Sequence, residues 1–259
     1  MRMMKKVLGT VTVLALSVSL LAGCGSTAVS PVSSTASTAA ESTTSSVVSE
    51  TTSAAADENA AAAAQLLNDL TGSYQELWPV ILADEYQQTW LDDCTALVGE
   101  ENAEAAFEKL SSMVTSDVYG EDAVEAYANG GGAYFCGFTN SLATLTFDGE
   151  TSTISGTDKD GNMLFSHTYH YIGMEPVHGL YEFESDDADS GEFTYFFLAP
   201  DTSAETYHIE FRYGSDAEAL SQYDAGEYAY WVASGISTDC DQTMIDNCIE
   251  LFCTENLAG

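Results

Sequence analysis

The pattern of apolar and polar residues divides the chain into a helical part and a part with strand periodicity. From about residue 60 to residue 128, apolar residues recur every three to four positions, which is typical of amphipathic helices. After the glycine run at 130–132 the period becomes two, with turn sequences such as Asp148-Gly149 and Asp160-Gly161 between apolar runs. The expected helices are 60–70, one within 75–90, 103–113, 121–127, 215–220 and 239–254, and the expected strands are 133–138, 143–147, 163–172, 179–183, 193–198 and 206–213.

Consecutive short strands joined by tight turns predict an antiparallel meander that closes, or nearly closes, into a barrel. The last helix would begin at a cap supplied by Thr238 or Asp239. We therefore expect a mainly β fold with added helices, namely an antiparallel barrel with an N-terminal helical segment and a C-terminal helix. Residues 58–259 are long enough to form this barrel as one domain with its own core.

The first 57 residues have a different composition. Three basic residues precede an apolar run that is too short for a comfortable membrane span, as in a secretory signal. The following Leu21-Ala22-Gly23-Cys24 resembles the lipobox of bacterial lipoproteins, in which the cysteine becomes the lipidated first residue. We expect a signal peptide at 1–23 and a disordered tether of Ser, Thr and Ala at 24–57. The mature protein would thus be extracytoplasmic and attached to the cell membrane by lipid on Cys24.

The chain is strongly acidic. It contains 41 Asp and Glu against 6 Lys and Arg, and three of those basic residues lie in the expected signal peptide. The resulting field repels nucleic acid and anionic membrane surfaces and concentrates cations nearby. It argues against a nucleic-acid partner and suits a cation-binding role, although an adaptation for solubility or salt would produce the same charge.

Five cysteines follow Cys24 in the sequence. In an exported protein they allow up to two disulfides with one thiol left over, and their spacing leaves the pairing open. None of them forms a CxxC pair, which argues against a zinc site made of thiolates. The five are Cys94, Cys136, Cys240, Cys248 and Cys253.

The strand expected at 206–213 carries the most distinctive chemistry. Its period of two places Thr206, His208, Glu210 and Arg212 on one face and the intervening apolar residues on the other. An imidazole and a carboxylate two residues apart on one face can present nitrogen and oxygen ligands to zinc. The same pattern also suits a polar strand face on which Glu210 pairs with Arg212.

Several segments of the domain resemble the ZinT (YodA) family of zinc-binding proteins. Residues 72–79 look like the family's early Trp-Gln-Ser-x-x-Pro stretch, and 139–145 lie where the family has its Thr-Asp-x-x-x-Ile strand. Residues 169–173 are similar to its Tyr-x-Tyr-x-Gly, and 208–214 followed by 228–231 are similar to its His-x-His strand and Trp-Pro-Thr-Tyr-Tyr segment. The resemblance implies a calycin, that is lipocalin-like, β-barrel that binds zinc.

The chain departs from this family at the family's three metal-binding histidines. In the gapless register His208 matches the first residue of the His-x-His pair and Glu210 replaces the second, whereas a register shifted by two would place Thr206 and His208 there. The family's Ser-Asp-His segment is replaced by residues among which Asp201 is the only ligand type. His178 lies in an expected turn that would reach a barrel mouth. The resemblance thus implies His208 and Glu210 as ligands, with Asp201 or His178 completing the set and water in an open position.

Two functions remain in competition. The first is the capture or delivery of zinc or another divalent metal outside the cytoplasmic membrane, with a metal-uptake transporter as a partner. The alternative is a metal-free calycin-like lipoprotein that binds a small apolar ligand or a partner protein, which the aromatic strands and the lost histidines favour. We do not expect an enzyme, because the sequence lacks a supported Ser-His-Asp arrangement, a phosphate-binding glycine loop and an HExxH motif.

Overall fold

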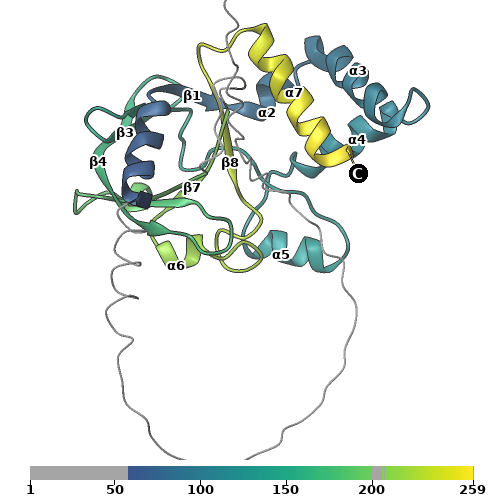
Figure 1. The fold of residues 1–259 in the computed structure, drawn as a ribbon. Coiled ribbons are helices and arrows are strands. Elements are labelled where there is room, and N and C mark those ends of the chain that lie inside the picture. Colours follow the sequence, from purple (N-terminus) through teal and green to yellow (C-terminus); the bar gives the residue numbers. More distant parts are fainter. Residues whose placement is uncertain (1–57, 200–205, 207, 259) are drawn as a thin grey trace, which may run out of the picture.

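The computed structural model describes residues 58–199, 206 and 208–258 of the 259-residue chain. Within these residues, eight antiparallel strands follow one another around a closed barrel, and β1 pairs with β8 to complete it (Figure 1). The expected fold class, a mainly β calycin-like barrel with added helices, is therefore confirmed. The strands are β1 (Gly72–Glu76), β2 (Thr144–Asp148), β3 (Thr153–Thr157), β4 (Met163–Met174), β5 (Tyr181–Ser185), β6 (Tyr195–Leu198), β7 (His208–Gly214) and β8 (Ala233–Ser237).

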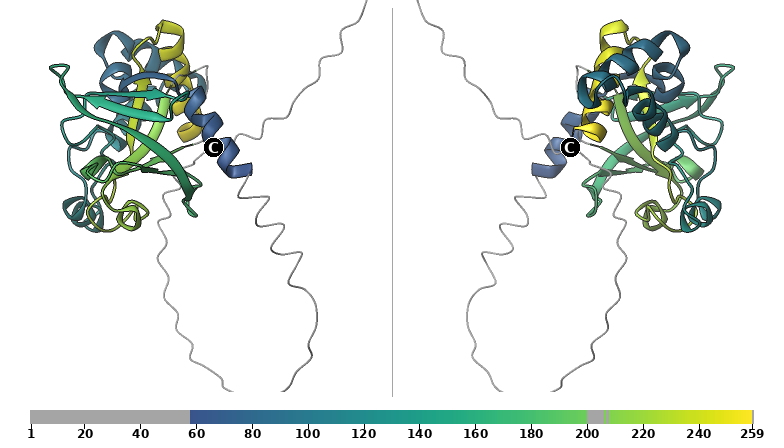
Figure 2. Two further views of the ribbon diagram at one scale, coloured as in Figure 1. Left: turned by 90° about the vertical axis from the view of Figure 1, so that its left-hand side faces the viewer. Right: turned by 90° about the vertical axis from the view of Figure 1, so that its right-hand side faces the viewer.

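Helices surround the barrel unevenly. One helix at 58–69 precedes β1, and α2, α3, α4 and α7 gather along one side of the barrel (Figures 1 and 2). In the described part of the chain, no helix has both the length and the apolar character needed to cross a bilayer. The labelled helices are α2 (Leu77–Ile81), α3 (Gln87–Val98), α4 (Ala103–Met113), α5 (Glu121–Ala128), α6 (Ala217–Leu220) and α7 (Gln242–Leu257), with short 3-10 turns η1 (Asp84–Tyr86) and η2 (Gly191–Phe193).

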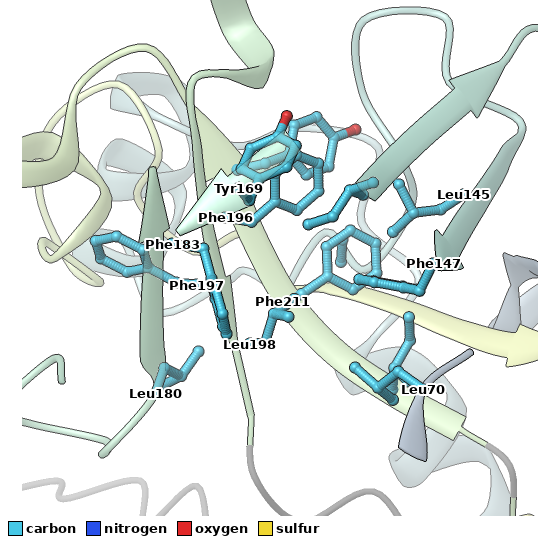
Figure 3. Packing of buried hydrophobic residues seen from close by; sticks show 14 of the residues in the cluster. Leu70, Leu145, Phe147, Tyr169, Leu180, Phe183, Phe196, Phe197, Leu198 and Phe211 are labelled. Carbon is cyan, nitrogen blue, oxygen red and sulfur yellow. The ribbon is translucent and has the colours of Figure 1, made fainter. Parts of the chain in front are cut away.

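The barrel encloses a core of large aromatic and aliphatic side chains. Phe147, Phe196 and Phe211 are almost fully buried in this core (Figure 3). Leu66 and Leu67 add the apolar face of the helix at 58–69 to the same cluster. Since burial of each such side chain contributes about 1.5–3 kcal/mol, this core is the main source of the barrel's stability.

A second core joins the helical layer to the outside of the barrel. It contains Trp90 of α3, Leu110 of α4, Ile249 of α7 and, from strand β8, Ile236. The indole Nε1 of Trp90 donates a 2.7 Å hydrogen bond to the carbonyl of Ile81, so the ring is held in place without an unpaired polar atom. The helical layer is therefore fixed against one face of the sheet, and this arrangement positions the site described below.

Some expected elements were wrong. The segment 133–138 is not a strand, because Phe135 forms only isolated bridges there. Strands β1, β3 and β8 were not expected, since their sequences GSYQE, TISGT and ASGIS consist largely of small and polar residues. Such residues carry little strand signal and are buried only because neighbouring strands cover them.

Two helix boundaries also differ from the prediction. The region 75–90 is not one helix but comprises the end of β1, then α2, η1 and the start of α3. Helix α7 begins after Asp241, whose side chain accepts a 3.0 Å hydrogen bond from the backbone N–H of Met244. The cap is thus Asp241 instead of Thr238 or Asp239, because Asp241 directly precedes the first helical residue, Gln242, and has the extended backbone of an N-cap.

Candidate functional site

Strand β7 presents His208 and Glu210 on the face that lies opposite the barrel core. Ile209 and Phe211 point into the core cluster, whereas His208 and Glu210 are half-buried and line a pocket of about 30 Å³. Side chains of α2 and α7 form the rest of this small pocket. The alternation expected from the sequence is present, and it directs the imidazole and the carboxylate toward the helical layer.

The ring of His208 is oriented by a neighbouring hydroxyl. Its Nδ1 lies 2.7 Å from Oγ1 of Thr206, the residue two positions earlier. Thr206 is connected to α7 in turn, because its carbonyl accepts a 3.2 Å hydrogen bond from Sγ of Cys248. Since the hydroxyl engages Nδ1, Nε2 is the ring nitrogen that would meet a ligand.

A larger cavity of about 350 Å³ adjoins the small pocket. Trp78, Glu210, Phe252 and Glu255 line both spaces, so the two form one groove between the outer face of β7 and β8 and helices α2 and α7. Glu210 is half-buried and Glu255 is exposed. The volume lies within the range of about 300–1,000 Å³ that is usual for small-molecule sites.

His178 lies in the wall of this larger cavity. It follows Glu175, which is fully buried and accepts hydrogen bonds from the backbone N–H groups of Val177 and His178 at 2.8 and 2.6 Å. Nδ1 of His178 is 3.5 Å from Oε2 of Glu175, and its ring lies 3.8 Å from that of Tyr223 between centroids. Among the described residues, this Nδ1 is buried and makes no hydrogen bond.

Arg212 continues the polar face of β7, but it is completely buried. Its guanidinium donates hydrogen bonds to the carbonyls of Leu220, Gln222 and Tyr228 and lies 4.2 Å from the centre of the Tyr223 ring. Burial lowers its pKa from the ordinary value. In the part of the chain that the structure describes, no ion pair joins Arg212 to a carboxylate, so the pairing with Glu210 considered from the sequence is not found.

Cys136 also lines the larger cavity. Burial, and secondarily the negative charge of Glu210, raise the pKa of its thiol to about 12. The thiol therefore keeps its proton at neutral pH, and a protonated thiol is a poor metal ligand. The charge of Glu210 thus affects another residue that lines the same cavity.

The structure brings together only some of the expected ligands. His208 and Glu210 share the small pocket, and Glu210 and His178 share the larger cavity. Asp201 and Cys24 lie outside the described residues. Within 58–199, 206 and 208–258, no three side chains of His, Cys, Asp or Glu form a group that could hold a metal ion.

Glu255 is a site residue that the sequence did not identify. It lies three positions after Phe252 on α7, so one helical face carries both side chains to the groove. That spacing was readable from the sequence. The position of α7 beside the pocket that His208 and Glu210 line was not, and this position makes Glu255 part of the site.

Comparison with known proteins gives structural matches of low sequence identity. No protein-family model and no curated protein matches the sequence. Among solved structures, the chain is similar to the Zn(II)-bound ZinT-like domain of Streptococcus pneumoniae AdcA, with 15% identity and a TM-score of 0.44 over 70% of this chain and 87% of that domain. It is also similar to Zn(II)-bound AdcA of the same organism, with 13% identity and a TM-score of 0.41 over 71% of this chain. It spans only 34% of that longer protein.

Proposed function

We propose that this protein binds a divalent cation, most favourably zinc, through His208 and Glu210. The observation that supports the proposal is their common position on one face of β7, where both line the same small pocket. Imidazole nitrogen and carboxylate oxygen are both zinc ligands, and the Thr206 hydroxyl on Nδ1 resembles the hydrogen bonds that usually orient a metal-binding histidine.

The donor set of the described residues fits an open site better than a closed one. His208 and Glu210 provide two ligands, and Asp201 or His178 would complete the set together with water. Glu255 adds a carboxylate at the rim of the same pocket. A site with few protein ligands and bound water suits a carrier that must release its metal, and its carboxylates make it tolerant of cations other than zinc.

The location of the protein belongs to the same proposal. A signal peptide at 1–23 and lipid on Cys24 would place residues 58–259 outside the cytoplasmic membrane, tethered by 24–57. The acidic surface would concentrate cations near the domain. Captured metal would then pass to a metal-uptake transporter in that membrane.

Calorimetry tests the metal proposal. The mature chain carrying Cys24→Ser, which remains soluble without lipid, is titrated with zinc alongside the same chain with His208→Ala. We expect His208→Ala to weaken binding at least tenfold, about 1.4 kcal/mol, because one of the few protein ligands is lost. His170→Ala is the matched control, since His170 is half-exposed on β4 and pairs with Asp186. Zinc affinity weaker than about a few hundred micromolar, or equal affinity of all three proteins, would contradict the proposal.

The cavity of about 350 Å³ favours a second function, the binding of a small organic molecule. Its wall is mainly apolar, with a few polar groups such as His178 and Ser234, as is usual for ligand sites. Native mass spectrometry of the purified mature chain would test this function through co-purified ligand. A ligand-free spectrum, together with no binding from a set of small metabolites, would argue against it.

A further inference from the structure

The carboxylates that line the larger cavity are not matched by a basic residue in its lining. Glu210 and Glu255 line it, and no Lys or Arg of the described chain does. The Arg212 guanidinium lies behind the wall against the Tyr223 ring, where it donates hydrogen bonds to three backbone carbonyls. A concave site with acidic groups and no basic group attracts cations and repels anions.

The apolar part of the lining is rich in aromatic rings. Trp78, Tyr134 and Phe252 line the cavity, and the rings of Trp78 and Phe252 are nearly perpendicular, with centroids 4.7 Å apart. The faces of such rings attract ammonium groups, and Trp does so most strongly. At about 350 Å³ the space is far larger than a bare metal ion needs, so it fits an organic cation.

One buried polar atom in the same wall makes no hydrogen bond. Nδ1 of His178 has none within the described residues, although Oε2 of Glu175 lies 3.5 Å away. The indole of Trp78 interacts with the Cys136 thiol, and the hydroxyl of Tyr223 interacts with the Arg212 guanidinium. The His178 imidazole can therefore offer a hydrogen bond to a ligand oxygen, in addition to the site for a positive charge.

We propose that the larger cavity binds a small organic ammonium compound that also bears a hydroxyl or carbonyl oxygen. The ammonium group would lie near Glu210 and Glu255 against the faces of Trp78 and Phe252, and the oxygen would lie at the His178 imidazole. This inference rests on the second function proposed above, and it names the chemical class of the ligand.

Choline and its neutral isostere 3,3-dimethylbutan-1-ol are the probes for this test. They have the same shape and hydroxyl group and differ in the positive charge. Each is titrated by calorimetry into the mature Cys24→Ser chain, and choline is expected to bind about tenfold or more tightly than the isostere. Glu210→Gln should remove this preference, whereas Glu150→Gln in the exposed β2–β3 turn should keep it.

A second variant addresses the hydrogen bond. His178→Phe keeps an aromatic ring and removes the ring nitrogens, so it should weaken choline binding severalfold while thermal unfolding shows that the chain remains folded. Equal affinity for choline and the isostere would overturn the cationic ligand while leaving a small-molecule cavity in place. No binding of choline at about 10 mM, a Kd weaker than any specific site, would also overturn it. Neither outcome changes the result of the zinc titration on His208→Ala, which tests the first function separately.

Discussion

Arg212 shows how a single charged residue can be kept inside a protein. It is the only basic side chain among the described residues that is fully buried, and three carbonyls accept hydrogen bonds from it. Those carbonyls belong to Leu220, Gln222 and Tyr228, which follow β7 in the connection to β8. The guanidinium therefore organises a segment without regular strand structure, including the part that holds Tyr223 against His178.

We expect Arg212→Met to lower the free energy of unfolding by about 3 kcal/mol or more, because it leaves buried carbonyls without donors. Equilibrium urea unfolding followed by tryptophan fluorescence would measure the change. Lys159→Met is the control, since Lys159 lies in an exposed turn and should change stability by less than about 0.5 kcal/mol. A loss from Arg212→Met as small as that of the control would show that these hydrogen bonds contribute little.

Helices α3 and α7 pack together, and α7 carries several residues of the groove, including Phe252 and Glu255. Cys94 of α3 and Cys253 of α7 are fully buried, with their sulfur atoms 3.9 Å apart. Asp93 of α3 lies near two carboxylates of α7, Asp246 and Glu250. The interface thus combines a close thiol pair with like charges that oppose the packing.

The repulsion at Asp93 leads to a pH-dependent prediction. Burial, followed by the charges of Glu250, Asp246 and Asp92, raises the pKa of Asp93, so the folded state holds this proton more tightly than the unfolded chain does. Ionisation of Asp93 therefore destabilises the fold at neutral pH, and the effect disappears below its ordinary pKa of 3.8.

Asp93→Asn should accordingly raise the free energy of unfolding at pH 7 by about 0.5–2 kcal/mol, with the gain shrinking toward pH 3. Urea unfolding at several pH values would measure it. Asp92→Asn removes the same charge from an exposed position on α3 and should have little effect. A gain from Asp93→Asn that persists unchanged at pH 3 would rule out the ionisation of Asp93 as its cause.

The thiol pair leads to a prediction about oxidation. Disulfide sulfurs are about 2.05 Å apart, so a small approach of α3 and α7 would allow Cys94 and Cys253 to bond, with two electrons passing to a disulfide oxidant such as oxidised glutathione. After refolding with this oxidant, peptide mapping should show the Cys94–Cys253 link, and its reduction should lower the free energy of unfolding by about 2–5 kcal/mol. Full alkylation of both thiols in the oxidised, unfolded protein would disprove the link.

The sequence predicted those elements whose residues carry their own signal. Helix α4 follows from the apolar spacing of Ala106, Phe107 and Leu110, and β7 follows from strict alternation. Strands β1, β3 and β8 were missed because their burial is imposed by neighbours. For the same reason the orientation of His208 and Glu210 on one face was predictable, whereas their position against α7 and the cavity beside them depended on tertiary packing.

At the scale of the whole molecule, stability and binding depend on different regions, the barrel core and the groove. The barrel core is filled with side chains such as Phe147 and Phe211, while the groove lies mainly between the sheet and the helical layer and reaches this core at Leu180. Changes to the groove should therefore leave the barrel intact. The strongly acidic composition surrounds the groove with a field that favours cations of either kind proposed above.

The proposed attachment of the molecule to a membrane through lipid on Cys24 is open to a direct test. Cells expressing Cys24→Ala should fail to incorporate labelled palmitate into the protein and should release it into the soluble extracytoplasmic fraction, because the acceptor thiol is lost. Ser26→Ala, two residues away, should retain both the label and membrane association. Undiminished labelling of Cys24→Ala would show that the lipid is attached to another residue.

Closure of the barrel by its first and last strands has a kinetic consequence. Tyr74 of β1 lies opposite Ser237 of β8, so the final seam joins segments that are far apart along the chain. Contacts of such long sequence separation form slowly, because most of the polypeptide must be ordered before β1 and β8 can pair. If the chain is exported as proposed above, its barrel would hence stay open until β8 has crossed the membrane, and the groove beside that strand would be able to bind ligand only after export.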